Sequence, residues 1–463
     1  MNKKRILILT YYWPPSGGGG VQRWMYFAIY LKRLGWNPTI ITVHPNKASY
    51  PLLDTTQLEM VNGIDCIYTS TCEPLKLYSY LKSGKSNEAI PYGNLGETSG
   101  SVFTKIMAFI RANIFVPDAR LGWMPFAKKA AANELKSKKY EWLVTTGPPH
   151  STHLAGLSLS KKFDIKWLAD MRDPWTEIYF LQNSFRFNFI KQLDRRLESR
   201  VLNTATLVTT VGPSMANLIR VKMKTPQNLH VLYNGFDHEM FENLETKKSK
   251  NEKFSISHVG LLGQSQRFDV FIDALKNSSI NLSKIKIHLA GLIHPLHLDK
   301  ARTDLPQVEL SHEEFLPRKL ALELMNSSDL LLLCPPMVGQ TQLIVSTKTM
   351  EYLACGIPIL GIGDTKSDAA SLIKQANNSS FNAPDGQTEI TQFMEDAFKN
   401  WETNSVQTSL FDPSIYSRFA VAKSLAALLN SQKYAFGHCL FCNTKNQVSS
   451  RIHKFPLILE HKL

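Results

Sequence analysis

The sequence predicts an α/β protein of two domains, each with a parallel β-sheet between layers of helices. Short apolar runs at residues 6–10, 142–146 and 329–334 are each followed by a glycine-, proline- or serine-containing loop, the order typical of a strand that leads into a helix. A chain of 463 residues is long enough for two hydrophobic cores. The stretch 242–253, rich in lysine, glutamate, asparagine and serine, is typical of a linker.

The expected order is therefore a first α/β domain over residues 1–235, a linker over 236–253 and a second α/β domain over 254–412. Residues 413–430 are amphipathic and predict a helix. The tail from 431 to 463 matches no pattern, and we assign it no role.

The composition indicates a globular protein, with 43% hydrophobic and 20% charged residues. No run approaches the ~18 apolar residues of a membrane span. The apolar start at residues 6–10 is too short for a signal peptide, so we expect a first buried strand and a cytoplasmic chain. Six scattered cysteines make no disulfide framework. Only Cys439 and Cys442 have metal-ligand spacing, which is weak evidence for zinc, and we predict neither a metal nor a cofactor.

The net charge of +14 is carried by the first half of the chain. Residues 1–234 contain 30 Lys and Arg against 15 Asp and Glu, whereas the remainder contains 23 against 24. A basic half suggests an anionic partner such as a membrane, a nucleic acid or a phosphorylated substrate. No nucleic-acid-binding motif is found, so that partner is not expected. Residues 102–115 are mostly apolar with Lys105 and Arg111 among them, as in a helix at a membrane interface; a core helix, which is the more common case, is the alternative.

Two loops of the first half follow predicted strands. Pro14, Pro15, Ser16 and four glycines, Gly17 to Gly20, lie between the strand 6–10 and a helix at 21–33, so backbone there can approach a phosphate or a sugar. The alternative is a mobile surface loop. After the strand 142–146, His150 and His153 lie at the start of a predicted helix at 154–161, at the edge where open α/β sheets bind ligands. A structural role for the two histidines is the alternative.

The next strand, 166–169, is followed by Asp170, Arg172 and Asp173. These charged residues could line a ligand-binding cleft, or they could pair with one another and cap the loop without binding a ligand. In the second half, a strand at 254–262 leads into a polar loop that ends at Arg267, whose guanidinium matches phosphate geometry. A solvated loop arginine is the other interpretation.

The most informative stretch is residues 346–360, S-T-K-T-M-E-Y-L-A-C-G-I-P-I-L. It predicts a short helix that stops at Gly356, because Pro358 cannot continue it, and then a buried strand. The loop before it follows the strand 329–334, so the free N–H groups of the helix start are placed to receive a phosphate. The geometry is that of a nucleotide site.

This stretch resembles the donor-binding signature of the family 4 retaining glycosyltransferases, which have the GT-B fold of two Rossmann-like α/β/α domains facing across a cleft. The first-half motifs at residues 31–42, T-T-G-P-P at 145–149 and D-M-R-D-P-W at 170–175 are similar to others in this group. The resemblance also implies that the helix at 413–430 crosses back onto the first domain. The family often has a second glutamate before the signature one, and here that place is Leu343.

The resemblance implies roles for individual residues. Glu351 would hold the donor ribose, with Ser346, Thr347 and Lys348 near the diphosphate and sugar and Arg267 on the diphosphate. Gly18 and Gly19 would lie near the acceptor and diphosphate. His150, or else His153, would reach the donor sugar, and Asp173 would hold an acceptor hydroxyl.

The expected function is therefore sugar transfer from a nucleotide-sugar to a saccharide or lipid-linked acceptor, with retention and without a metal, in surface polysaccharide biosynthesis. The reaction would take place at the inner face of the cytoplasmic membrane. One alternative is a GT-B nucleotide-sugar epimerase. Another is a catalytically silent protein that binds sugar or docks on a membrane, which Leu343 keeps open.

Overall fold

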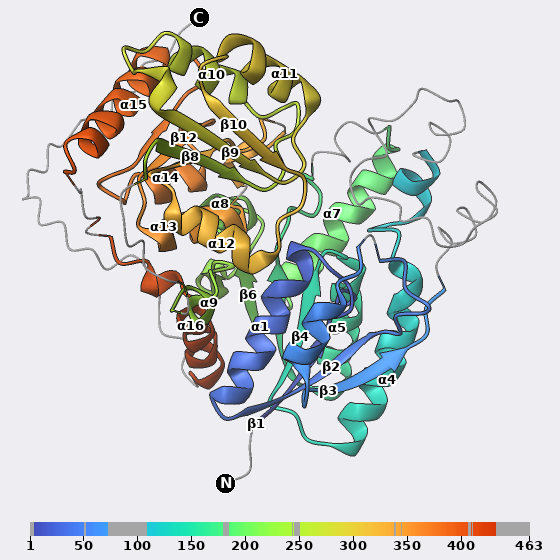
Figure 1. Cartoon of the computed structure of the whole chain (residues 1–463). Coiled ribbons are helices and arrows are strands. Elements are labelled where there is room, and N and C mark those ends of the chain that lie inside the picture. Colours follow the sequence, from blue (N-terminus) through green and yellow to red (C-terminus); the bar gives the residue numbers. More distant parts are fainter. Residues whose placement is uncertain are drawn as a thin grey trace, which may run out of the picture.

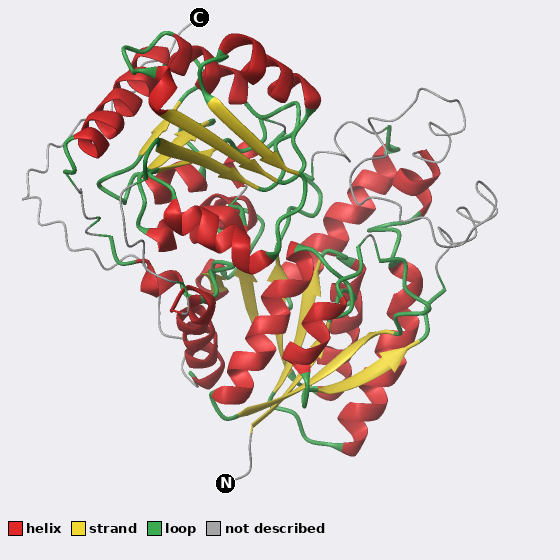
Figure 2. Ribbon diagram, viewed as in Figure 1, coloured by secondary structure: helices red, strands yellow, loops and turns green. Residues whose placement is uncertain are grey.

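The computed structural model contains two α/β domains, each with one parallel sheet between layers of helices (Figure 1, Figure 2). It describes residues 4–50, 52–72, 109–178, 185–242, 244, 251–337, 339–343, 345–405, 409 and 411–431. Residues 102–108 of the predicted helix 102–115, the pair Cys439 and Cys442, and the tail after residue 431 lie outside the described residues.

The first sheet has seven strands in the order β3-β2-β1-β4-β5-β6-β7, all parallel. The order reverses between β1 and β4, so the chain winds outward in both directions from these two central strands. The strands are β1 (Lys4–Leu9), β2 (Trp36–Val43), β3 (Asp65–Thr69), β4 (Trp142–Gly147), β5 (Lys166–Met171), β6 (Leu207–Thr210) and β7 (Leu229–Val231).

Successive side chains of β1 point to opposite faces of the sheet and show that both faces are covered. Ile6 and Ile8 join the core formed with α1 (Gly19–Arg33) and α16 (Arg418–Asn430), whereas Leu7 and Leu9 face the opposite core. All four side chains are fully buried, and each contributes about 1.5–3 kcal/mol of transfer free energy. The opposite face is covered by α4 (Met124–Ser137), α5 (Ser151–Phe163), α7 (Asn188–Leu202) and α8 (Pro213–Arg220).

The second sheet has six parallel strands in the order β10-β9-β8-β11-β12-β13. Its order reverses between β8 and β11. The strands are β8 (Phe254–Val259), β9 (Ile285–Ala290), β10 (Glu309–Glu313), β11 (Leu330–Leu333), β12 (Ile359–Ile362) and β13 (Ser380–Asn382). One face packs on α10 (Phe268–Lys276), α11 (Pro295–Asp304) and α15 (Gln387–Glu402), and the other on α12 (Arg318–Ser327), α13 (Thr347–Cys355) and α14 (Asp368–Ile373).

The last helix, α16, returns to the first domain, as predicted (Figure 1). The Ser417 side chain accepts a hydrogen bond from the Ala420 N–H, which starts the helix, and Val421 and Leu425 are buried in the first-domain core. The Trp142 indole donates to the Leu429 carbonyl at 3.1 Å. These contacts tie the end of the second domain to the first sheet.

The two domains also touch at α8. Ser214, in its first turn, donates its backbone N–H and its hydroxyl to the Asp368 carboxylate of α14, at 3.0 and 2.7 Å. Leu343, in the short turn Thr341–Leu343, packs against the first-domain core. Within the segment predicted as a linker, residues His238–Glu242 form the short helix α9.

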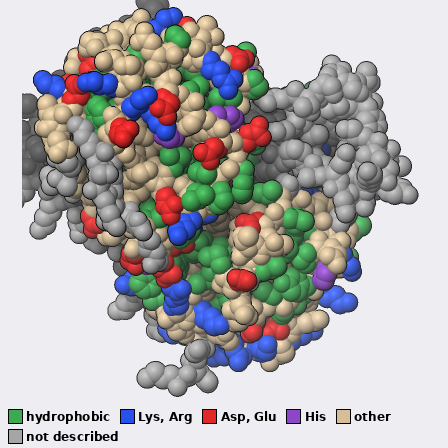
Figure 3. Space-filling view, in the orientation of Figure 1, with side chains coloured by type: hydrophobic (Ala, Val, Ile, Leu, Met, Phe, Trp, Pro, Cys, Tyr) green, Lys and Arg blue, Asp and Glu red, His purple; other side chains and the backbone are tan. Residues whose placement is uncertain are grey.

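No helix in the described part of the chain is long and apolar enough to cross a membrane. Figure 3 shows lysine and arginine side chains spread along the lower edge of the first domain, in line with the basic charge of the first half of the sequence.

Candidate active site

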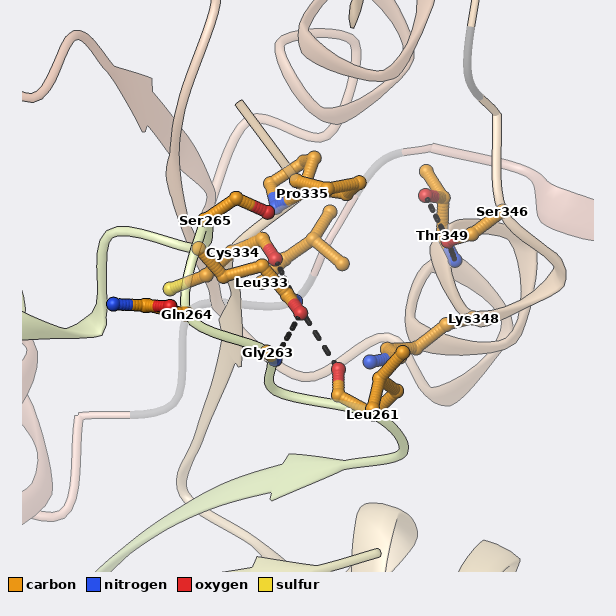
Figure 4. Close-up of a pocket in the computed structure, with 12 residues that line it drawn as sticks. Leu261, Gly263, Gln264, Ser265, Leu333, Cys334, Pro335, Ser346, Lys348 and Thr349 are labelled. Carbon is orange, nitrogen blue, oxygen red and sulfur yellow. Dashed lines mark hydrogen bonds between the residues drawn. The ribbon is translucent and has the colours of Figure 1, made fainter. Parts of the chain in front are cut away.

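A pocket of about 970 Å³ lies at the carboxyl ends of β8 and β11 in the second domain (Figure 4). These strands flank the point where the order of the sheet reverses, which is where open α/β sheets bind ligands. Three segments line the pocket, namely the loop after β8, the end of β11 with its loop, and the start of α13. The lining residues are Leu261, Gly263, Gln264, Ser265, Gln266, Leu333, Cys334, Pro335, Pro336, Ser346, Lys348 and Thr349.

Gln266 joins two of these segments. Its side-chain amide donates to the carbonyls of Leu261, at 3.1 Å, and of Cys334, at 2.5 Å, and its carbonyl oxygen accepts from the Gly263 N–H (Figure 4). The side chain is buried, so these bonds fix the loop after β8 against the loop after β11. This role of Gln266 could not be predicted, because a glutamine in a polar loop has no distinguishing sequence pattern.

Lys348 lies on the opposite wall of the pocket, in the first turn of α13. Its Nζ is 3.2 Å from His258 Nε2, and Gly260 leaves room for it, since a Cβ there would lie 2.9 Å from Lys348 Nζ. Loss of solvent lowers the pKa of Lys348 to about 8 and that of His258 to about 3. The histidine is therefore neutral, and the lysine ammonium lacks a carboxylate partner within hydrogen-bond distance among the described residues. An anion in the pocket would supply one.

The start of α13 adds free N–H groups on the same side. Ser346 caps the helix by accepting from the Thr349 N–H at 3.3 Å, and the helix ends at Gly356, whose φ of +67° favours glycine. Ser346 and Lys348 line the pocket, whereas Thr347 does not. The helix dipole and Lys348 therefore place positive potential at this end of the pocket.

Glu351 lies one turn further along α13 and is not among the lining residues. Its carboxylate, only 3% exposed, pairs with both terminal nitrogens of Arg318, one of them at 3.1 Å. A ribose could reach Glu351 only by sharing this carboxylate with Arg318. Arg318 itself carried no signal in the sequence.

Arg267 lies outside the pocket lining. Its guanidinium pairs with Asp269 at 2.9 Å, and both side chains are more than one third exposed. To reach a phosphate in the pocket, Arg267 would have to leave this partner.

The first domain has a matching arrangement at the carboxyl ends of β1 and β4. Gly18 has a φ of +89° and precedes α1, whose start has no side-chain cap. Gly18 and Gly19 are exposed, and a Cβ at either would meet no atom within 4 Å. The loop in front of α1 is therefore open to solvent at these two glycines.

Arg172 ties the glycine loop to the loop after β4. Its guanidinium donates to the carbonyls of Gly147, at 3.2 Å, of Pro148, at 2.5 Å, and of Gly20. Asp170 instead pairs with Arg23 at 2.8 Å and also accepts from Trp24, Thr146 and Thr209. The two charges are therefore not paired with each other, and Asp170, which is fully buried, holds the core together.

Asp173 is half-buried and has no hydrogen bond or ion pair within the described residues. Burial raises the pKa of its carboxyl, and the neighbouring Arg172 opposes this shift. The site thus brings an unpaired acid next to the two loops at β1 and β4.

His150 and His153 are brought together at the start of α5. The His150 ring stacks on Trp175 at a centroid distance of 4.9 Å, with Nε2 3.3 Å from the Pro174 carbonyl. His153 Nδ1 lies 2.8 Å from the Thr145 hydroxyl. That hydroxyl also accepts from the Trp167 indole, and it can either donate its hydrogen to His153 Nδ1 or accept a second hydrogen bond from it.

The other nitrogen of each ring, His150 Nδ1 and His153 Nε2, is buried without a hydrogen-bond partner among the described residues. Both face Gly147, where a Cβ would lie 2.9 and 2.6 Å away. Burial lowers both pKa values, that of His153 to about 3, so both rings are neutral. The two neutral imidazoles therefore each keep one buried, unsatisfied nitrogen at the carboxyl end of β4.

Leu343 occupies the place of the family's frequent first glutamate, and its packing against the first-domain core makes this an apolar contact between domains. Seven of the ten predicted site residues fall into two groups, one at each switch point, whereas Thr347, Glu351 and Arg267 lie outside the pocket lining. Lys348 and Ser346 line the second-domain pocket, while Gly18, Gly19, His150, His153 and Asp173 belong to the first domain.

Comparison with known proteins finds a family model that matches part of the chain. Residues 98–240 match the sequence model of Glycosyltransferase Family 4. No curated protein sequence matches this chain significantly.

Solved structures match nearly the whole chain. Sucrose-phosphate synthase from Thermosynechococcus elongatus aligns with a TM-score of 0.56 at 12% identity, over 92% of this chain and 98% of that chain. HepE from Anabaena, in complex with UDP, aligns at 0.53 and 14%, over 92% and 99%. A Listeria monocytogenes protein assigned provisionally as a UDP-N-acetylglucosamine 2-epimerase aligns at 0.52 and 11%, over 92% and 95%.

At these identities the similarity establishes the fold and not the activity. The chain therefore has the GT-B fold of glycosyltransferases, and residues 98–240 in its first domain match Glycosyltransferase Family 4.

Proposed function

We propose that this protein is a glycosyltransferase that moves a sugar from a nucleotide-sugar donor to a saccharide or lipid-linked acceptor. The observation that carries the proposal is the second-domain pocket, where Lys348 and the start of α13 meet at the switch point of the sheet. Its volume of about 970 Å³ is in the range of ligand pockets and suits a nucleotide-sugar.

The donor diphosphate would bind Lys348 and the N–H groups at the start of α13, with Ser346 and Thr347 beside it and the ribose toward Glu351. UDP is a reasonable nucleotide to test first, because HepE, which shares the fold, was solved in complex with UDP. Arg267 would contribute only if it exchanged Asp269 for the phosphate.

In the chemical step, the bond between the anomeric carbon and the diphosphate oxygen breaks, and a bond forms to an acceptor oxygen. Negative charge grows on the departing diphosphate, where Lys348 and the helix dipole stabilise it, so we propose a metal-independent reaction. The acceptor proton passes to the departing phosphate, and the resemblance to retaining enzymes leads us to expect retention.

The first domain would bring the acceptor. His153, in the tautomer that carries its proton on Nε2, would donate to a donor-sugar hydroxyl, and His150 lies beside it, 5.9 Å between ring centroids. Asp173 would accept from an acceptor hydroxyl, and the exposed loop at Gly18 and Gly19 would close over the substrates. We propose surface polysaccharide biosynthesis at the inner face of the cytoplasmic membrane as the setting.

Two alternatives have specific support. The provisionally assigned epimerase shares the fold, so a nucleotide-sugar epimerase fits the same pocket. Leu343, which replaces an acid with an apolar contact, fits a protein that binds the donor without turnover.

Isothermal titration of UDP, GDP and their sugars, followed by product analysis, separates these possibilities. A transferase binds a nucleotide-sugar and releases the nucleoside diphosphate only when an acceptor is added. An epimerase converts the sugar without acceptor, and a silent protein binds without either reaction. If no nucleotide binds, the pocket assignment is wrong.

A further inference from the structure

The start of α7 exposes a cluster of phenylalanine side chains. Phe185, Phe187 and Phe189 are 67%, 42% and 66% exposed, and Phe109 is 40% exposed. The rings contact one another, with centroid distances of 5.4 Å for Phe185 and Phe187, 5.6 Å for Phe187 and Phe189, and 6.0 Å for Phe109 and Phe185. Exposed rings that touch one another form a continuous apolar surface, unlike apolar residues scattered singly over a protein.

The backbone under this surface is held firmly. Asn113 donates to the Phe185 carbonyl and accepts from the Phe187 N–H, both at 2.9 Å. Arg186, between them, points inward, where it donates to the Ala112 carbonyl at 2.9 Å and pairs with Asp194 at 2.8 Å. Because successive side chains of an extended segment point to opposite sides, anchoring Arg186 inside directs Phe185 and Phe187 outward.

The exposed side of α7 carries only positive charge. Its two acids are turned inward, since Asp194 pairs with Arg186 and Glu198 with Lys222 at 2.8 Å. Both acids are buried. The exposed charged residues are Lys191, Arg195, Arg196 and Arg200, and none has an ion-pair partner among the residues that the structure describes.

The apolar and basic residues share one stripe of the helix. Phe189, Leu193, Arg196 and Arg200 follow the spacing i, i+4, i+7 and i+11, which places them along a single face. Leu193 is 44% exposed. Figure 1 places α7 on the side of the first domain away from α16. The surface therefore does not face the returning helix that joins the two domains.

We infer that this surface, the α7 patch, docks the first domain on a bilayer that contains anionic lipids. The patch consists of Phe109, Phe185, Phe187, Phe189, Leu193, Arg196 and Arg200. Aromatic rings enter the headgroup boundary while basic side chains attract lipid phosphates, and an acid-free surface matches an anionic membrane. The inference goes beyond the proposed reaction and does not depend on it, because the donor pocket lies in the other domain.

The experiment is co-sedimentation of the full chain with phosphatidylcholine vesicles, with and without phosphatidylglycerol, at about 0.1 M and about 0.5 M salt. The wild type is expected to pellet with anionic vesicles at low salt and to be released at high salt. Arg196→Ser with Arg200→Ser is expected to lower the partition coefficient roughly 25-fold, because each basic residue near an anionic surface contributes about fivefold. Phe185→Ser with Phe189→Ser should also release the protein.

Two matched pairs serve as controls. Lys366→Ser with Lys374→Ser removes two exposed lysines of the second domain, and Val221→Ser with Ile415→Ser removes two exposed apolar side chains elsewhere. Both pairs should pellet like the wild type. Three results would overturn the inference. The controls could lose as much vesicle binding as the patch variants, the wild type could pellet equally with neutral and anionic vesicles, or the patch variants could bind as well as the wild type. UDP titration of each variant reports on the pocket separately, so failure of the proposed function is seen independently of failure of docking.

Discussion

Lys348→Met tests the donor pocket most sharply, because it should raise stability and weaken binding at once. In the folded protein the pKa of Lys348 lies near 8, below its ordinary value of 10.5, because the ammonium has lost solvent. A shift of this size corresponds to about 3 kcal/mol of folding free energy at neutral pH. Methionine has a similar shape without the charge, so the free variant should be more stable by up to about 3 kcal/mol in urea denaturation near neutral pH.

The pH dependence of the wild type has a definite sign. Between pH 8 and 10.5 the folded state binds fewer protons at Lys348 than the unfolded state, so the contribution of this residue to stability rises with pH across that window. The affinity for a diphosphate should fall as the pH rises, because only the charged lysine pairs with the anion. The UDP dissociation constant should rise about tenfold between about pH 7 and about pH 9.

The assay is isothermal titration of UDP to the wild type, Lys348→Met and the control Lys366→Met at each pH. Loss of a charged hydrogen bond, worth about 1.5–3 kcal/mol, should weaken binding roughly 10- to 100-fold in Lys348→Met and leave a weak affinity that no longer varies with pH. Lys366→Met, an exposed lysine of the same domain, should follow the wild type. A variant that binds UDP as tightly as the wild type, or keeps the same pH dependence, would refute the assignment of Lys348 to the diphosphate.

Three further predictions concern the contacts around the site. Arg318→Ala leaves the buried Glu351 carboxylate without its partner and should lower the free energy of unfolding by about 2 kcal/mol in urea denaturation. Adding Glu351→Gln to the same chain should restore most of this loss. A loss near zero would mean that the ion pair is not held as described. Gly147→Ala places a methyl group 2.6 Å from His153 Nε2 and should abolish transfer while UDP binding stays unchanged, whereas full activity would remove the histidines from the reaction. Asp368→Ala removes the cap of α8 across the domain contact, and should cost about 1 kcal/mol and increase the radius of gyration in solution scattering, while Asp368→Asn should do less. No change in scattering would argue against a role for this contact in holding the domains together.

The two sheets and the loops at their switch points could be predicted because their signals are local. An apolar run such as 329–334 followed by prolines, or Gly356 followed by Pro358, marks the end of one element and the start of the next within a few residues. The helix α5 starts at Ser151, three residues earlier than Leu154, the expected start, for a reason that no local pattern contains. Asp118 accepts from the Ser151 N–H at 2.7 Å and so caps the helix from 33 residues away.

Elements without an apolar run were missed. The strand β10, Glu309–Glu313, is polar and lies at the edge of its sheet, where it pairs with only one strand, β9. The exposed face of α7 was also missed. The sequence does not show that Arg186 and Asp194 form a buried ion pair, and this pair leaves the aromatic and basic side chains on the surface.

The site itself was partly predictable. Lys348 and Ser346 were placed by the signature stretch and line the pocket, whereas Gln266, His258 and Arg318 act on groups 68, 90 and 33 residues away and left no pattern in the sequence. Asp170 and Arg172 appeared in one motif, yet each binds elsewhere, Asp170 to Arg23 and Arg172 to backbone carbonyls.

A crystal structure of the protein with UDP would test the central claim most directly. The account predicts the diphosphate in the second-domain pocket, between the loop of Ser265 and Gln266 and the start of α13, within hydrogen-bond distance of Lys348 Nζ. A nucleotide bound elsewhere on the chain, or a diphosphate that leaves Lys348 paired only with His258, would contradict it.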